Sequence, residues 1–83
     1  MPTVVPTIED RVKRILRDQL GIDEATASDR TKTWEDLGAD ELDTVEVIMA
    51  CEEEFAIHID EDEADHATNI GGLIDLVTNK YNG

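Results

Sequence analysis

Few residues in this sequence of 83 could form a nucleophile activated by histidine. The candidates are one serine, Ser28, one cysteine, Cys51, and two histidines, His58 and His66. A serine or cysteine needs an adjacent base to become a nucleophile, and no recognisable motif surrounds Ser28 in its predicted loop. Cys51 falls on the inward side of a predicted helix, where a free cysteine usually packs as a small apolar residue. We therefore expect no enzymatic activity.

Carboxylates are numerous, and they could serve as acid–base pairs or as metal ligands. A glycosidase-type pair needs a cleft, for which so short a chain leaves little room. The segment from Asp60 to Asp62 resembles the opening of a calcium-binding loop, but Ala64 stands at its fifth position and Asp65 replaces the glycine expected next. The sequence predicts no dedicated metal site, although the acidic clusters should hold divalent cations loosely.

The charge of the chain is large and unevenly distributed. The formal net charge is -14, from 21 acidic and 7 basic residues. Four of the basic residues lie within residues 11–17, and none lies between Lys32 and Lys80. Such a charge repels nucleic-acid phosphates and favours basic protein surfaces as partners. The carboxylates from Glu52 to Glu54 and from Asp60 to Glu63 either form a solvated face or also steer a partner.

The length and the cysteine count set the expected class of protein. One cysteine excludes an internal disulfide and is typical of an intracellular protein. No apolar run approaches the roughly 20 residues of a membrane span, and no signal peptide is evident. We expect a cytoplasmic monomer without membrane attachment. Residues 1–6, which include two prolines, are predicted to be a flexible tail, and residues 7–83 a single helical domain.

Apolar residues at helical spacing predict an all-α fold with three main helices, one short helix and a long first loop. The main helices are expected over residues 8–20, 41–55 and about 70–81, and the short helix over about residues 60–66. The loop over residues 22–39 has no sustained period. It should be held to the core by three apolar residues: Ile22, Trp34 and Leu37.

Capping residues mark the ends of these predicted helices. Thr7 precedes the first helix and Asp40 the second, while either Thr68 or Asn69 precedes the last. Gly21 ends the first helix, because glycine readily adopts the left-handed conformation found after a helix. The sequence therefore predicts the helix starts as well as their apolar faces.

The predicted helix over residues 41–55 has two apolar faces, of which a small domain can bury only one. One face holds four residues: Val47, Ile48, Cys51 and Phe55. The other face, here called the apolar stripe, holds three: Leu42, Val45 and Met49. Carboxylates flank the stripe, with Glu46 and Glu53 on one side and Glu52 on the other. An exposed apolar stripe fringed with acid is typical of a surface that meets a basic partner.

The residues from Leu37 to Phe55 resemble the modification-site helix of acyl carrier proteins, small acidic proteins that hold acyl chains on a phosphopantetheine arm. The family has Asp-Ser-Leu at the helix start. This chain has Asp40 and Leu42, with Glu41 in place of the serine that bears the arm. The resemblance extends from about Thr7 to about Val77. It implies a small four-helix bundle that serves fatty acid or related acyl metabolism.

The resemblance also implies partners and a cofactor. Acyl-chain synthases and the transferase that modifies carriers would present basic surfaces to seven residues: Asp40, Leu42, Val45, Glu46, Met49, Glu52 and Glu53. The prosthetic group of the family is 4′-phosphopantetheine, which a transferase joins to the serine hydroxyl as a stable phosphodiester. The carboxylate of Glu41 could give only an acyl phosphate, which water cleaves. We therefore expect this chain to carry neither the arm nor an acyl group.

Two origins of Glu41 stay open. In one, the serine of a working carrier was replaced, which keeps the protein unmodified or imitates the charge of the phosphate. In the other, the chain is a natural relative that keeps the fold and the recognition helix without the carrier chemistry. A function of a different class is the alternative to both: a non-carrier interaction or regulatory protein that shares the bundle.

Overall fold

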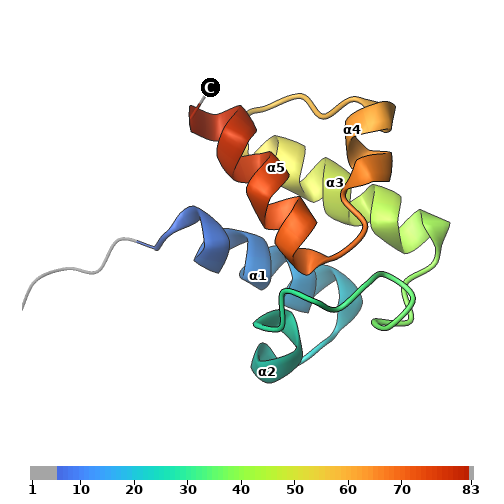
Figure 1. Ribbon diagram of the computed structural model, residues 1–83. Coiled ribbons are helices and arrows are strands. Elements are labelled where there is room, and N and C mark those ends of the chain that lie inside the picture. The colour runs from blue at the N-terminus through green and yellow to red at the C-terminus, as the bar shows by residue number, and fades with distance from the viewer. Residues whose placement is uncertain (1–5, 83) are drawn as a thin grey trace, which may run out of the picture.

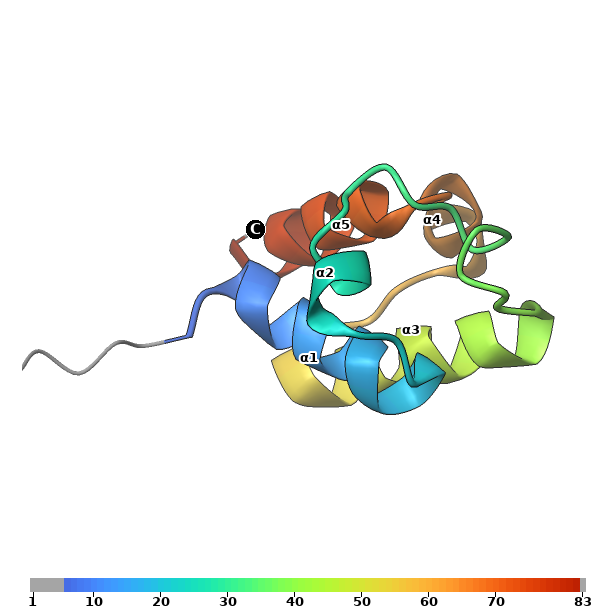
Figure 2. The same ribbon diagram turned by 90° about the horizontal axis from the view of Figure 1, so that it is seen from below.

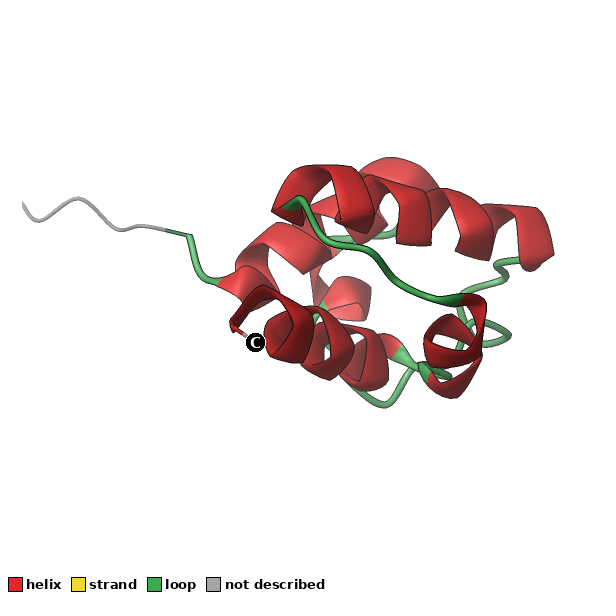
Figure 3. Cartoon of the chain, turned by 90° about the horizontal axis from the view of Figure 1, so that it is seen from above, coloured by secondary structure: helices red, strands yellow, loops and turns green. Residues whose placement is uncertain are grey.

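The computed structural model describes residues 6–82, a range that contains five helices and no strand (Figure 1). In chain order they are α1 (Ile8–Leu20), α2 (Glu24–Ala27), α3 (Glu41–Phe55), α4 (Glu61–His66) and α5 (Ile70–Asn82). Thr33 and Asn69 form a β-bridge, but it is isolated and makes no strand. Figure 3 therefore shows only helix and loop. The all-α fold predicted from the sequence is confirmed.

Side chains at the starts of α1 and α3 determine where these helices begin. The hydroxyl of Thr7 accepts a hydrogen bond from the backbone N–H of Asp10 (3.0 Å), and the Asp10 carboxylate accepts one from the Thr7 N–H (3.3 Å). Asp40 and Asp43 form the same reciprocal pair at α3, at 2.9 and 3.2 Å. Each pair satisfies backbone N–H groups that lack intrahelical acceptors. Gly21, with a φ of 67°, follows α1 in the left-handed conformation, so the predicted boundaries are confirmed.

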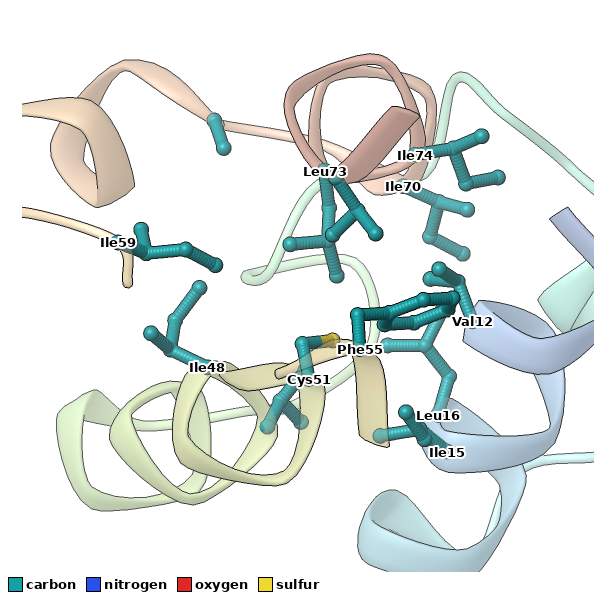
Figure 4. Close-up of a cluster of buried hydrophobic side chains, with 13 residues drawn as sticks. Val12, Ile15, Leu16, Ile48, Cys51, Phe55, Ile59, Ile70, Leu73 and Ile74 are labelled. Carbon is teal, nitrogen blue, oxygen red and sulfur yellow. The ribbon is translucent and has the colours of Figure 1, made fainter. Parts of the chain in front are cut away.

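The hydrophobic core lies between α1, α3 and α5 (Figure 4). α1 and α3 lie beside each other, and α5 packs against both of them (Figure 2). The largest fully buried side chains come from all three helices: Val12 and Leu16, Val47 and Cys51, and Ile70, Leu73 and Val77. Burial of one such aliphatic side chain contributes about 1.5–3 kcal/mol. This shared core therefore holds the three main helices together.

The connection between α1 and α3 is fastened to the rest of the fold by two side chains. Trp34 is half-buried against the core, and its Nε1 donates a hydrogen bond to the carbonyl oxygen of Ala67 (2.8 Å). Arg30 forms ion pairs with Glu9 of α1 (2.9 Å) and with Asp75 of α5 (2.7 Å). Two further residues of this connection pack against the core as predicted: Ile22 and Leu37. The predicted packing role of Trp34 is thus confirmed.

The first turn of α5 contains two glycines, and the structure gives a reason for one of them. The N–H of Gly71 donates to the carbonyl oxygen of Arg30 (2.9 Å), and a Cβ at Gly71 would lie 3.1 Å from both that oxygen and the Cβ of Arg30. Glycine therefore allows the long connection to approach α5 closely. The side chain of Asn69 accepts a hydrogen bond from the N–H of Gly72 (2.7 Å), so Asn69 is the residue that caps α5.

An extended linker, residues 57–60, carries the chain from the end of α3 to α4 (Figure 3). Its position depends on α3, because the carboxylate of Glu52 accepts a hydrogen bond from the N–H of Ile59 (2.9 Å). The side chain of Ile59 is buried in the core. Lys80 of α5 pairs with Glu63 of α4 (2.7 Å), which holds α4 from the other side. The extended linker and the short helix after it are confirmed.

The prediction that residues 22–39 form only a loop is wrong at one place, because Glu24–Ala27 form the short helix α2. The Asp23 carboxylate accepts a hydrogen bond from the N–H of Thr26 (2.8 Å) and so starts this single turn. Four residues are too few to show a helical period in the apolar pattern. The fold therefore has two short helices in addition to the three main ones.

Two further expectations concern the chain ends and membranes. The tail predicted for residues 1–6 lies outside the described residues except for Pro6. The boundary of the helical domain at residue 7 stays a prediction. Among the helices within residues 6–82, none has both the length and the apolar character needed to span a membrane.

Candidate functional site

Both predicted apolar faces of α3 are present, and only one of them is buried. Val47 and Cys51 are fully buried, whereas Leu42, Val45 and Met49 are 64%, 47% and 58% exposed. A large apolar side chain that stays in water gives up the stabilisation that burial would supply, about 1.5–3 kcal/mol for each residue. The apolar stripe is therefore available for contact with another molecule.

The start of α3 presents a negative charge beside the apolar stripe. Glu41 is the first residue of the helix and is exposed, and its side chain forms no hydrogen bond or ion pair within residues 6–82. Asp40 and Asp43 already satisfy the capping positions, so the helix does not depend on Glu41 for its start. A carboxylate here is still favourable, because the N-terminus of a helix is the positive end of its dipole.

A groove runs between α3 and α4 and begins at Glu41. Its volume is about 460 Å³. Ten residues line it: Glu41, Thr44, Val45, Ile48, Met49, Glu52, Ile59, Glu61, Ala64 and Asp65. Half of these side chains are apolar and four are carboxylates, with no basic residue among them. The groove thus extends the acidic and apolar character of α3 onto α4.

The carboxylates that flank the apolar stripe fall into two groups. Glu46 and Glu53 are exposed, and neither forms an ion pair within the described part of the chain. Glu52 is engaged instead, because its Oε2 accepts from the N–H of Ile59 and lies 3.3 Å from Nδ1 of His58. Of the three flanking carboxylates, Glu52 is therefore already engaged with the linker, whereas Glu46 and Glu53 are free to meet a partner.

The residues considered for catalysis are each engaged locally. Ser28, at the end of α2, donates a hydrogen bond to Glu24 at its start (3.2 Å). His66 lies at the end of α4, where its Nδ1 is 2.6 Å from the backbone oxygen of Asp62. Burial in the core, with Glu54 and Glu52 nearby, raises the pKa of Cys51 to about 12. A thiol with such a pKa is protonated at neutral pH and is a poor nucleophile.

Residues 10–77 match the family model described as the phosphopantetheine attachment site. The match covers most of the chain, so this chain belongs to the phosphopantetheine attachment-site family. Domains of this family are carriers without catalytic activity of their own, and the group that they carry is 4′-phosphopantetheine. The family resemblance, the absence of an enzymatic role and the small all-α fold predicted from the sequence are therefore confirmed.

The residues at the start of α3 do not fit covalent attachment of that group. Attachment as a phosphodiester requires a hydroxyl, and Glu41 offers a carboxylate. The nearest hydroxyl along this helix is that of Thr44, which donates a hydrogen bond to the carbonyl oxygen of Asp40 (3.0 Å) one turn below. Ser28 stands at the end of α2 and bonds to Glu24. Neither hydroxyl replaces the one that the attachment position lacks.

The sequence did not predict that α4 contributes to this site. The acidic residues of α4 were visible as a charge cluster, but their placement opposite α3 depends on the linker and on the burial of Ile59. The alternation from Ala56 to Ile59 was the available signal. It showed that Ile59 is apolar within an extended segment, without showing which helix it would contact.

Proposed function

We propose that this protein is an acyl carrier protein-like domain of fatty acid or related acyl biosynthesis that docks to acyl-processing enzymes without carrying an arm. The observation that carries the proposal is the exposed apolar stripe of α3, which has Glu46 and Glu53 beside it and Glu41 at its start. The membership of the family supports the kind of partner. The proposal includes a monomeric protein in the cytoplasm, consistent with its single cysteine.

The composition of this face favours a basic enzyme surface over other partners. Glu46 and Glu53 stand beside the stripe, where Lys or Arg of a partner can meet them, and Asp40 lies at its N-terminal end. Rim charges of this kind mainly raise the rate of encounter, while apolar side chains that become buried slow dissociation. We assign the second task to Leu42, Val45 and Met49.

The alternative function is that of an interaction or regulatory protein outside acyl transfer, and Glu41 is the observation that favours it. A permanent carboxylate stands where a carrier needs a hydroxyl, so the chain could occupy the docking site of an enzyme and deliver nothing. In both cases the same face of α3 would make the contact. The two functions differ in the partners that the face selects.

The deciding experiment incubates the chain with coenzyme A, magnesium and a carrier-protein transferase, and measures the mass of the intact protein. The present chain should gain no mass, whereas the Glu41→Ser variant should gain one phosphopantetheine. Serine loses a favourable contact with the helix dipole, worth about 0.3–1 kcal/mol at an exposed position, so the variant should fold. It also gains a hydroxyl at a helix N-terminus, where an incoming phosphate is favoured.

The outcomes separate the two functions. Modification of the present chain would refute the claim that it carries no arm. A folded Glu41→Ser variant that stays unmodified would count against the acyl-carrier proposal and favour the regulatory alternative. Circular dichroism of both chains tests whether they are folded. Glu61→Ser is the control for position: it places a serine on α4, at the far side of the groove, and it should stay unmodified.

A further inference from the structure

A second pocket lies on the side of α1, away from the α3–α4 groove. Six residues line it: Pro6, Asp10, Arg11, Arg14, Arg17 and Glu54. Its volume is about 330 Å³, within the range of small-molecule sites. Three of the seven basic residues of the chain contribute to this one pocket, here called the arginine pocket.

Arg11 is held in place within the arginine pocket by contacts with α3. Its Nε donates to the Glu54 carboxylate (2.9 Å) and its Nη2 donates to the backbone oxygen of the same residue (3.0 Å). The guanidinium also lies over the ring of Phe55, 4.3 Å from the ring centre. A guanidinium carries five N–H donors. Arg11 is therefore rigid and still has donors that are not used by Glu54.

The other two guanidiniums are less constrained and leave more donors available. Arg17 pairs with Glu24 of α2 through Nη1. Arg14 forms no ion pair within residues 6–82. Arg14 lies one turn of α1 from Arg11 and one turn from Arg17, so its guanidinium can share a ligand with either neighbour. All three side chains line the same pocket.

Most charges of the pocket are paired within the fold, and the guanidinium of Arg14 is the exception. Asp10 accepts the N–H of Thr7, and Glu54 is paired with Arg11, so both are already engaged. Arg17 is likewise paired with Glu24, so Arg14 and Asp10 are the lining charges that form no ion pair within residues 6–82. At physiological salt, charges farther away than about 8 Å are largely screened. An oxyanion in the pocket would therefore depend on Arg14 and on the N–H donors that Arg11 and Arg17 do not use in their ion pairs.

We propose that the arginine pocket binds the phosphate-type oxyanion of a small soluble ligand. Guanidinium groups match phosphate oxygens with two parallel N–H donors, and they bind phosphate more specifically than single point charges do. The site is separate from the apolar stripe and from Glu41. It does not depend on the function proposed above, and a chain without docking partners would still have it.

The test is a titration of the ¹⁵N-labelled full chain with inorganic pyrophosphate, followed by NMR in a buffer free of phosphate. The expected result is saturable shifts of the side-chain Nε–H signals of Arg11, Arg14 and Arg17. Arg14→Gln should raise the dissociation constant about tenfold, as expected for the loss of a charge-assisted hydrogen bond. Lys32→Gln is the matched control, since it removes one positive charge in the connection before α3 and should leave binding unchanged.

Three further titrations distinguish phosphate recognition from a general response to anions or to lipid surfaces. Sodium chloride at the same ionic strength should not reproduce the shifts, and succinate should bind more weakly than pyrophosphate. Vesicles of phosphatidylcholine containing phosphatidylglycerol should not bind the chain. The proposal is overturned by shifts that chloride reproduces, by equal binding of succinate, by binding to vesicles only, or by unchanged affinity in Arg14→Gln.

Discussion

On α1, three of the four basic side chains pair with carboxylates, whereas on α3 the carboxylates of Glu41, Glu46 and Glu53 form no ion pair within residues 6–82. With 21 acidic and 7 basic residues, most acids cannot be paired, and the fold determines which ones are. The basic residues join different elements, as Arg11 does between α1 and α3. The scarce positive charge thus stabilises the bundle, whereas the unpaired carboxylates of α3 stand on an exposed face.

Reversal of the unpaired charges on α3 should have the largest effect. Glu46→Lys together with Glu53→Lys should lower the association rate with a carrier-modifying transferase about tenfold at low salt, and the loss should shrink as salt rises. Stopped-flow measurements at two salt concentrations would show this. The matched control, Asp18→Lys with Glu35→Lys, makes the same change in net charge elsewhere. If both pairs lowered the rate equally, only the net charge would matter.

Truncation of the apolar stripe should affect the other rate constant. Met49 is 58% exposed, so Met49→Ala leaves the core intact and removes an apolar contact with the partner. We expect dissociation about tenfold faster and little change in association. Surface plasmon resonance measures both rates. Tyr81→Ala, at an exposed large apolar position outside the stripe, is the control; an equal effect from it would show that the stripe has no special role.

The unpaired acids should also make the bundle sensitive to ions. Like charges repel more in the folded state than in an expanded chain, so millimolar magnesium or moderate salt should raise the melting temperature. A relief of about 1 kcal/mol corresponds to about 4–8 °C in a domain of this size. Thermal melts followed by circular dichroism test this. A melting temperature that does not respond to either addition would contradict the claim that unpaired carboxylates repel one another in the folded bundle.

Removal of a paired basic residue should weaken the fold rather than docking. Arg30 bridges Glu9 and Asp75, and its guanidinium also lies 3.4 Å from the carbonyl oxygen of Gly71. Because these pairs are partly exposed, we expect Arg30→Gln to lower the free energy of unfolding by only about 1 kcal/mol. Urea denaturation measures the change. Lys32→Gln, in the same connection, forms the control, and an equal loss there would mean that the ion pairs contribute nothing specific.

The smallest effect concerns a paired carboxylate on α4. Lys80, with the N–H of Asp60, lowers the pKa of Glu63 from its ordinary value. A lowered pKa in the folded state gives stability that is complete above the unfolded pKa, about 4.3, and is lost as the pH falls through the folded pKa. Glu63→Gln should therefore be less stable than the parent at pH 7 in urea denaturation, with the difference shrinking toward pH 3. Glu61→Gln, which removes a carboxylate from the same helix, is the matched control for the loss of charge.

Short-range patterns made part of this molecule predictable. The start of α3 follows from Asp40 and Asp43, which act within three residues of each other, and its two faces follow from helical spacing. The α3–α4 groove could not be predicted, because Glu52 holds Ile59 across seven residues and the linker has no period of its own. The arginine pocket depends on Arg11 and Glu54, which are separated by 43 residues.

The buried cysteine provides a native probe of how often the helical bundle opens. Its side chain is fully covered in the core, and its high pKa keeps it protonated, so a thiol reagent cannot modify Cys51 in the closed bundle. Labelling must wait for α3 to separate from α1 and α5. The labelling rate would then report how often the bundle opens, without any reporter group added to the exposed face of α3.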